Sequence, residues 1–387
     1  MKVGFCQLDI TPPLGSESPG FFEKRVFWDV HDPLHVKAAV FEEAGSRVGI
    51  VGVDSLSIKA STVRKAREMA ERMSGIPAGS ILVAASHDHQ GGPTVEWAGD
   101  RDAVLRASED KDLMRRLLDT APAADPSYIE FVAERIASAV TLADRHKVEA
   151  LCAVGVGREE TVSFNRRFKM KNGRQMTHPG KGNPDIVEPA GPIDPDVGVL
   201  SAWSTEGKFL GCVVNFACHG TTLNVEAFSA DWPYYLDRTV RAAMGQDSVV
   251  VFLNGACGDV TQVDNQSMRE AEFGEKWCRR VGTKVGAEAL KVIAEAEPAE
   301  LSPVKPSREV IQLERRPVPE KRLRRSKEEV ERTTPRQNPE WVFARDTIIL
   351  SELLKLERSV PCEIQAIQIG PAAFVSSPAE LFCELGL

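Results

Sequence analysis

The chain has 387 residues, enough for one large hydrophobic core or two moderate ones, and its 42% hydrophobic and 27% charged residues are typical of a soluble globular protein. Its formal net charge of −8 argues against nucleic acid as a partner, because phosphate binding needs a basic surface. No stretch approaches the ~20 apolar residues of a membrane span, and no basic segment followed by an apolar one opens the chain. We therefore expect no membrane span, no signal peptide and a cytoplasmic location.

The N-terminal part predicts strands that alternate with helices. Apolar runs bounded by turn residues predict strands, and helical spacing of apolar residues predicts helices. The expected elements are a strand at Val3–Ile10, a hairpin of His35–Glu42 with Arg47–Val53, a helix at Ala60–Met73, a strand at Ile81–Ala85 and a helix at Ser127–Asp144. Asp125 or Ser127 is expected to cap this last helix through its side-chain oxygen.

Residues 173–195 are rich in Gly, Pro, Asn and Asp, and they predict a long loop without regular structure. Such a loop covers an active site or lies plainly on the surface, and the sequence leaves both readings open. The elements expected after it are a hairpin of Val199–Ser204 with Phe209–Ala217, a helix at Ala230–Met244 capped by Ser229, a strand at Val249–Asn254 and a helix at Glu270–Ala296.

Residues 314–337 carry many charges of both signs. Because acidic residues interleave with Lys and Arg, a solvated or partly disordered excursion is favoured over a nucleic-acid patch. A helix at Trp341–Glu357 and a hairpin of Glu363–Ile369 with Ala372–Val375 are expected to follow. This mixture of elements predicts the α/β class, with mixed β-sheets and flanking helices in a single domain over residues 1–387.

Three of the seven histidines lie in two short segments that follow apolar runs. His87 and His89 come just after the strand expected at Ile81–Ala85, and His219 comes just after Phe209–Ala217. If the first strand continued through them, His87 and His89 would point to the same face. Imidazole is the commonest protein ligand of zinc, and chemistry in α/β proteins gathers at strand ends. The pattern therefore predicts a metal site at His87, His89 and His219.

A zinc site of this kind needs a further ligand, and a carboxylate is expected to join the histidines. Asp54, Asp259 and Glu380 each follow an apolar strand, although a carboxylate there can equally be a helix cap. The remaining histidines (31, 35, 146 and 178) are expected to be structural. Among them, a functional role stays most open for His178, because it lies in the long loop. The eight cysteines form no Cys-x-x-Cys pair and are expected to pack as free thiols, with Cys218 and Cys257 beside the suspected site.

These segments, in this order, make the chain resemble the catalytic domain of the neutral (non-lysosomal) ceramidase family over roughly residues 1–385. The stretches that carry the resemblance are Asp9-Ile10-Thr11-Pro12-Pro13, Asp32-Pro33-Leu34, Ser86-His87-Asp88-His89-Gln90-Gly91-Gly92, Asn165-Arg166, Gly207-Lys208-Phe209-Leu210-Gly211, Asn215-Phe216-Ala217-Cys218-His219-Gly220-Thr221, Ser229-Ala230-Asp231, Asn254-Gly255-Ala256-Cys257-Gly258-Asp259-Val260-Thr261 and Pro378-Ala379-Glu380.

The resemblance implies hydrolysis of a linear amide bond, of the N-acyl or ceramide type, by water activated at one zinc ion. It assigns His87, His219 and Glu380 as metal ligands. It places His89 beside the metal, where it helps to stabilise the oxyanion, and gives Arg166 a contact with the substrate or the developing charge. Thr261 stands where the family has a serine near the metal. The implied partner is a small N-acyl or lipid-like substrate.

The sequence departs from the family pattern in three ways. Thr261 replaces the serine, and Gln262-Val263 replaces Pro-Asn. The family has a tyrosine ligand beyond the glutamate, whereas all three tyrosines here precede Glu380. The chain ends at Leu387, without the immunoglobulin-like domain of longer members, so we expect a C-terminally truncated catalytic domain.

Two other functions stay open on the sequence alone. One is a catalytically impaired homologue that only binds a ligand or partner, which Thr261 and the missing tyrosine favour. The other is a binuclear metallophosphoesterase, although its Asp-x-His and Gly-Asn-His signatures are absent; its ligands would be Asp54, His87, His89, Asp259 and His219. The sequence fixes neither the substrate nor the oligomeric state.

Overall fold

The computed structural model describes residues 1–96, 100–270, 272–333 and 339–387. Its centre is an eight-stranded sheet in the order β14-β13-β12-β7-β1-β4-β5-β6, in which β5–β6 and β13–β14 are parallel pairs and the other neighbours are antiparallel. The strands are β1 (Lys2–Asp9), β4 (His35–Glu43), β5 (Ser46–Val53), β6 (Ile81–Ala85), β7 (Val148–Arg158), β12 (Asp196–Ser204), β13 (Phe209–Phe216) and β14 (Val249–Asn254). The α/β class with a mixed sheet is confirmed.

The sheet curls so that its two ends pack against each other. Val251 and Leu253 of β14 share a hydrophobic core with Ile50 of β5 and Leu82 of β6, although β14 and β6 are opposite edges of the sheet. The contact is close, because a Cβ added to Gly52 would lie 2.5 Å from the Phe252 carbonyl oxygen. The segments that follow β6, β13 and β14 are thereby brought to one place.

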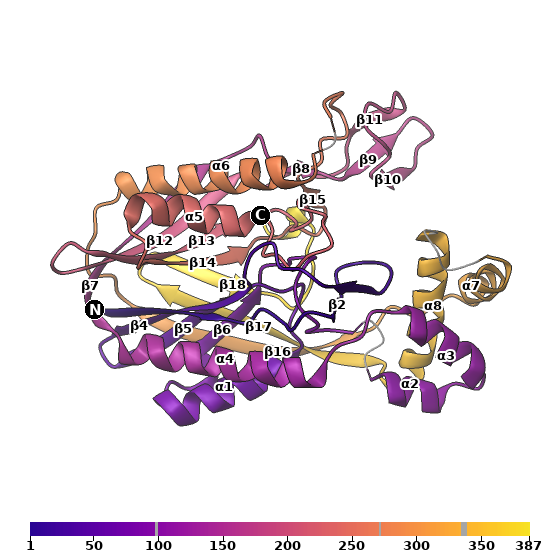
Figure 1. The fold of residues 1–387 in the computed structure, drawn as a ribbon, viewed down its shortest axis with the longest axis horizontal. Helices are drawn as coiled ribbons and strands as arrows, with labels where there is room; N and C mark the ends of the chain where they lie inside the picture. The colour runs from indigo at the N-terminus through magenta and orange to yellow at the C-terminus, as the bar shows by residue number, and fades with distance from the viewer. Residues whose placement is uncertain (97–99, 271, 334–338) are drawn as a thin grey trace.

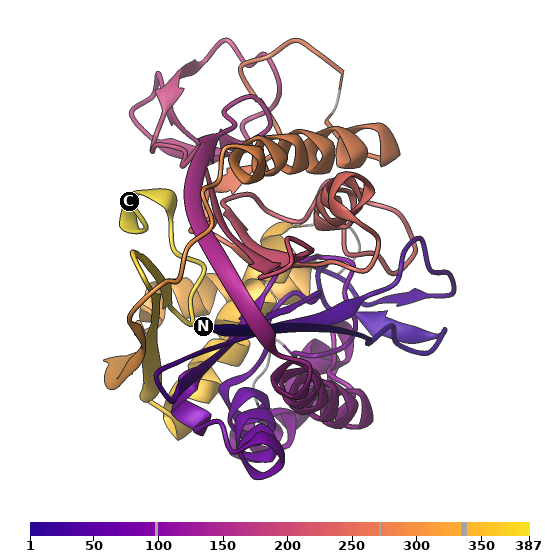
Figure 2. The same ribbon diagram turned by 90° about the vertical axis from the view of Figure 1, so that its left-hand side faces the viewer.

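Helices cover both outer faces of the curled sheet. The pair α1 (Ala60–Ser74) and α4 (Pro126–Arg145) lies on one face, and the pair α5 (Trp232–Met244) and α6 (Glu275–Ala294) lies on the other. Figures 1 and 2 show the resulting layers of helix, sheet, sheet and helix. Each pair buries apolar side chains against its half of the sheet, and this burial is the main stabilising term of such a fold.

The predicted N-terminal capping residue is confirmed for α4 but not for α5. Asp125 caps α4, and its carboxylate accepts from the backbone N–H groups of Ser127 and Tyr128. The prediction that Ser229 caps α5 is wrong, because Asp231 takes that role and the Ser229 hydroxyl donates to Asp32 instead. Helix α6 also begins five residues later than expected, after Gly274.

The prediction that residues 173–195 lack regular structure is wrong. Strands β10 (Gln175–Thr177) and β11 (Ile186–Pro189) pair with β9 (Arg167–Met170) in a small sheet of their own. Backbone pairing with β9 holds these mostly exposed strands, so apolar alternation gave no signal for them. Next to this sheet, β8 (Phe164–Asn165) pairs with β15 (Val260–Thr261).

The described part of the stretch at 314–337 is mostly exposed, but much of it is helical. Helix α7 (Glu320–Arg332) packs Leu323 and Val330 against a helical lobe, and residues 334–337 lie outside the described residues. The other helices of the lobe are α2 (Arg101–Ala107), α3 (Lys111–Thr120) and α8 (Pro339–Leu356). The seven-residue spacing of Leu323 and Val330 was the available helical signal.

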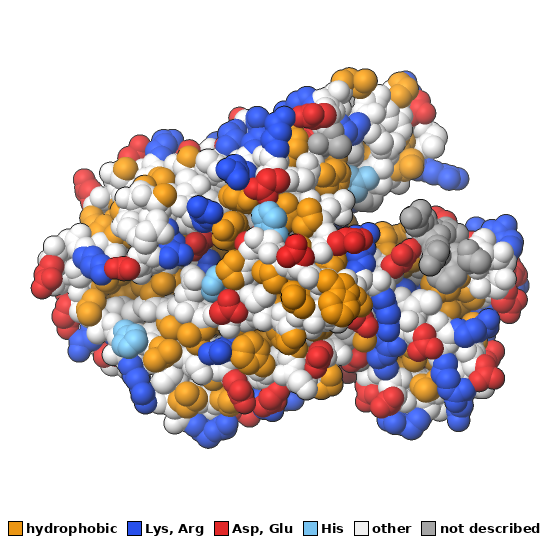
Figure 3. Space-filling model, in the orientation of Figure 1, with side chains coloured by type: hydrophobic (Ala, Val, Ile, Leu, Met, Phe, Trp, Pro, Cys, Tyr) orange, Lys and Arg blue, Asp and Glu red, His pale blue; other side chains and the backbone are white. Residues whose placement is uncertain are grey.

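Five further strands complete the fold. They are β2 (Ser16–Ser18) paired with β3 (Arg25–Phe27), and the sheet of β16 (Val304–Glu314), β17 (Ser359–Ile369) and β18 (Ala372–Ser376). Figure 3 shows the surface hollowed between the helical lobe and the small sheet around β9. Within the described residues, none of the helices has the length and apolar character needed to cross a bilayer.

Candidate metal centre

The two histidine segments are joined by their backbones. Asp88 and Gly220 form a parallel bridge, in which the His89 N–H donates to the Gly220 carbonyl at 3.0 Å and the Gly220 N–H donates to the His87 carbonyl at 3.3 Å. The strand predicted at Ile81–Ala85 is confirmed as β6, and it does not continue through His87, which has a φ of 60°. This left-handed turn, rather than strand alternation, directs the imidazoles of His87 and His89 toward a common point.

Asn254 ties the same two segments together from a third strand end. Its side-chain amide donates to the Ser86 carbonyl at 2.8 Å and to the Cys218 carbonyl at 3.0 Å. Our sequence reasoning gave Asn254 no role, although it ends an apolar strand, as the two histidine segments do. That position was the signal that could have identified it.

The three imidazoles converge on one point. The ring centroid of His87 lies 5.0 Å from that of His89 and 4.5 Å from that of His219, and the Nε2 atoms of His87 and His219 are 3.1 Å apart. The ligand atoms of these three side chains all lie within 4.8 Å of one another, so together they could hold a metal ion.

Hydrogen bonds on the far side of each ring set the tautomers. Nδ1 faces a backbone carbonyl in all three: Leu56 at 3.0 Å from His87, Gly20 at 2.6 Å from His89 and Cys257 at 2.7 Å from His219. A carbonyl only accepts, so Nδ1 carries the proton and Nε2 presents a lone pair. Such second contacts commonly orient histidines that bind metals.

The arrangement fits a metal ion. Two lone pairs at the 3.1 Å separation of the His87 and His219 Nε2 atoms repel unless a cation lies between them. Two nitrogens bound to one tetrahedral zinc at about 2.0–2.1 Å lie about 3.3 Å apart, close to this value. The His89 Nε2 atom is buried and has no hydrogen-bond partner among the described residues, which is the state expected of a group that faces a ligand.

The imidazoles of His89 and His219 are neutral near pH 7. Burial lowers the pKa of His89 to about 4, with a smaller contribution from His87. Burial likewise lowers the pKa of His219 well below its usual value, and the positive charge of Arg166 adds to the effect. Neutral imidazole is the form that binds metals, so these residues need not lose a proton to do so.

The Glu380 carboxylate reaches the same point from the segment after β18. Its Oε2 atom lies 3.5 Å from the His87 Nε2 and 3.8 Å from the His219 Nε2. The contact with the His87 imidazole lowers the pKa of Glu380, and the positive charge of Arg166 adds to the effect, so the ionised carboxylate is favoured. The structure thus brings together the three residues that the resemblance names as ligands.

Arg166 lies beside this group, between β8 and β9. Its backbone N–H donates to the Asp259 carbonyl at 2.7 Å, and its guanidinium donates to the Gly258 carbonyl at 2.6 Å. Burial lowers the pKa of Arg166, and the negative charge of Glu380 opposes that effect. A guanidinium has five N–H donors, so others remain for a ligand.

Thr261 is buried in β15, and its hydroxyl oxygen accepts from the Val263 N–H at 3.0 Å. This bond closes a local turn, so the Thr261 hydroxyl contacts the backbone of Val263. The three tyrosine hydroxyls are likewise engaged elsewhere: Tyr128 with Ile10, Tyr235 with Glu275 and Tyr234 with Arg238.

The two aspartates predicted as alternative ligands serve other partners. One Asp54 oxygen accepts from the His35 backbone N–H at 2.8 Å, and both Asp259 oxygens accept hydrogen bonds from residues on β8, β9 and the C-terminal segment. Neither joins the histidine group among the described residues. The ligand set of a binuclear metallophosphoesterase is therefore not assembled.

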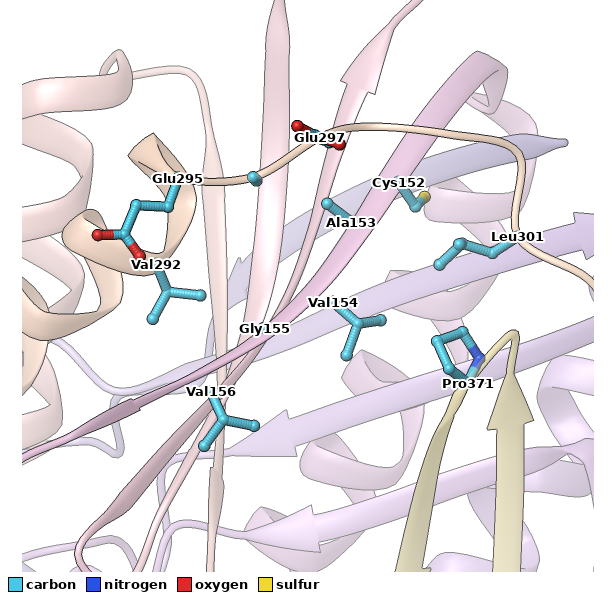
Figure 4. Close-up of a pocket in the computed structure, with 11 residues that line it drawn as sticks. Cys152, Ala153, Val154, Gly155, Val156, Val292, Glu295, Glu297, Leu301 and Pro371 are labelled. Carbon is cyan, nitrogen blue, oxygen red and sulfur yellow. The ribbon is translucent and has the colours of Figure 1, made fainter.

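The candidate centre is distinct from the groove shown in Figure 4. That groove, of about 460 Å³, lies between β7, the end of α6 and the turn at Pro371, and Val154, Val156 and Val292 line it. No residue of the histidine group contributes to it. It offers apolar surface but no convergent polar groups of the kind that fix a substrate.

Comparison with solved structures finds the same fold in ceramidase structures, among them the following two. A structure titled as a ceramidase complexed with C2 has a TM-score of 0.71 at 18% identity, and neutral ceramidase from Pseudomonas aeruginosa has a TM-score of 0.68 at 17% identity. Both comparisons cover 100% of this chain but only 64% and 63% of those chains, so this chain spans less than two thirds of their length. Neither models of known protein families nor curated proteins give a match. The predicted resemblance is confirmed at the level of structure: the chain has the neutral ceramidase fold.

Proposed function

We propose that this protein is a zinc-dependent hydrolase that cleaves a linear amide bond in an N-acyl, lipid-like substrate. The observation that carries the proposal is the convergence of imidazole Nε2 lone pairs from His87, His89 and His219 on one point that the Glu380 carboxylate also reaches. The fold shared with two ceramidase structures supports it.

His87, His219 and Glu380 would hold a single zinc ion, which leaves a position open for a small ligand, as catalytic zinc sites do. When bound, zinc supplies a Lewis acid and lowers the pKa of a bound water from about 15.7 toward about 7. The low pKa of Glu380 and the neutral state of His219 keep the protein groups ready to bind it.

In its geometry, though not through its lowered pKa, His89 can accept a proton. Its Nδ1 proton is committed to the Gly20 carbonyl, so the neutral ring has a lone pair and no proton at Nε2. It can take the proton of the attacking water and return it to the leaving amine, as a general base and then a general acid. In its neutral form it cannot donate to an oxyanion from Nε2, so this role differs from the one that the resemblance implied.

Arg166 is the better candidate for stabilising the charge on the substrate carbonyl oxygen. It is cationic and partly buried, and its charge acts on His219 and Glu380. One well-placed donor of this kind is commonly worth about 3–4 kcal/mol in the transition state. We propose that Thr261 contributes to the site only by stabilising the turn that its hydroxyl closes.

The first experiment measures zinc and activity in the same preparation. Purified protein is loaded with Zn²⁺, desalted and analysed for metal, and it is then assayed for amine release from N-acyl substrates of varied chain length and for phosphate release from a phosphate monoester. One zinc per chain with amine release supports the proposal. Phosphate release instead favours a phosphoesterase, and absence of both zinc and turnover favours the impaired homologue.

A further inference from the structure

We propose that Asp259 is a positioning residue that docks residues 377–387 against the fold and thereby holds the Glu380 carboxylate beside the histidines. The proposal rests on the proposed function in one respect, namely that Glu380 binds the metal. Asp259 itself would touch neither metal nor substrate.

Asp259 is fully buried, and each of its oxygens already has a donor. Oδ1 accepts from the Cys383 backbone N–H at 2.8 Å. Oδ2 accepts from the Asn165 amide at 2.9 Å and from the Arg167 Nε at 3.0 Å, and it forms an ion pair with the same guanidinium. The carboxylate thus joins the C-terminal segment to the β8–β9 region.

Two residues next to Asp259, namely Arg167 and Gly258, also contact the C-terminal segment. The Arg167 guanidinium lies 4.1 Å from the centroid of the Phe382 ring and 3.6 Å from a Glu384 oxygen. The Gly258 N–H donates to the Leu381 carbonyl at 2.8 Å, and a Cβ added to Gly258 would lie 2.4 Å from the Glu380 carbonyl oxygen. The segment therefore fits only because residue 258 has no side chain.

Glu380 needs this support because its own side chain is 56% exposed and residues 377–382 form neither helix nor strand. The docking contacts at residues 381–384 follow it directly in the chain, so they determine where its backbone lies. Burying the Asp259 charge is costly unless it is paired, and Arg167 pairs it. The Asp259–Arg167 ion pair thus anchors the segment that carries Glu380, without itself binding the metal.

The test compares zinc affinity in a double-mutant cycle of Asp259→Asn and Glu380→Gln. Asparagine keeps the shape of the side chain but places an NH₂ group against donors. We expect the dissociation constant for Zn²⁺, measured by chelator competition, to rise about 10–100-fold in Asp259→Asn, as for other residues that orient metal ligands. In the Glu380→Gln background the same substitution should have no further effect.

Asp237→Asn is the matched control, since Asp237 is also buried and ion-paired, with Lys37 on β4, and contacts other elements. It should leave zinc affinity within about two-fold of the parent chain, because its carboxylate contacts Lys37 and Arg241 rather than a residue of the candidate metal centre. Equal losses in Asp237→Asn, or a full Asp259→Asn effect without Glu380, would show general destabilisation and overturn the proposal.

A second measurement needs no metal. Cys383 is fully buried where it meets Asp259, so release of the segment should speed alkylation of its thiol, followed by mass spectrometry in the folded apoprotein. Faster labelling of Cys383 in Asp259→Asn and Gly258→Ala, but not in Asp237→Asn, supports the docking role. This result would hold even if the parent chain binds no zinc, and then only the proposed function would fail. Unchanged labelling in both variants overturns the docking role.

Discussion

The Nε2 atom of His87 lies 3.1 Å from the Nε2 atom of His219, a residue 132 positions away in the chain. Because the Nδ1 atoms of both rings face backbone carbonyls, the two nearest atoms are both hydrogen-bond acceptors. A contact of this kind is favourable when a metal ion or a proton lies between the two nitrogens, and the metal-binding predictions rest on it.

Removing either imidazole should remove the metal. We expect His87→Ala and His219→Ala to bind Zn²⁺ at least about 100-fold more weakly and to lose hydrolysis, because a three-ligand site cannot hold the ion with two. Equilibrium dialysis with metal analysis measures the affinity. His146→Ala, at the exposed end of α4, is the control and should bind zinc like the parent chain.

His89→Gln should separate binding from catalysis. Loss of the Nε2 acceptor should lower kcat by about 10²–10⁴-fold, the usual contribution of a general base. Zinc content should stay close to one per chain if His87, His219 and Glu380 are the ligands. Steady-state kinetics alongside metal analysis gives both quantities, and complete loss of zinc would instead make His89 a ligand.

The Thr261 hydroxyl should matter little for the chemical step. Its oxygen accepts from the Val263 N–H, so Thr261→Ala should cost about 1 kcal/mol of stability from a lost buried hydrogen bond and change kcat less than about five-fold. Urea unfolding and kinetics test the two parts. A drop in kcat of several hundred-fold in Thr261→Ala, with zinc retained and activity restored in Thr261→Ser, would assign the hydroxyl a direct part in the reaction.

Stability should fall in mild acid because of His35. Burial, with help from Lys37, lowers the pKa of His35 to about 4 in the folded chain, whereas an unfolded histidine titrates near 6.5. As the pH falls, the histidine therefore gains its proton in the unfolded chain before it does so in the folded chain. The free energy of unfolding is highest above about pH 6.5 and decreases by about 3 kcal/mol in all as the pH falls toward about 4. Urea unfolding from pH 7.5 to pH 4 should show a shallower decline in His35→Gln, and equal slopes would contradict the shift.

Much of the fold could be predicted from local patterns. Apolar runs marked β4, β5, β6, β13 and β14, and helical spacing marked α1, α4 and α8. Elements without such a pattern were missed, as β10 and β11 were, because their backbones pair with β9 while their side chains remain mostly exposed. Helix α7 was missed because its charges outnumber the two apolar residues, Leu323 and Val330, that pack it.

By itself the sequence determined the kinds of side chain available for chemistry: imidazoles after strands at 87, 89 and 219, and a carboxylate at 380. Only the tertiary structure decided that they meet. The curled sheet brings its opposite edges together, the left-handed turn at His87 aims the rings, and carbonyls of Leu56, Gly20 and Cys257 set their tautomers. These are long-range and backbone effects, and because every residue type has the same backbone carbonyl, no side-chain pattern in the sequence records them.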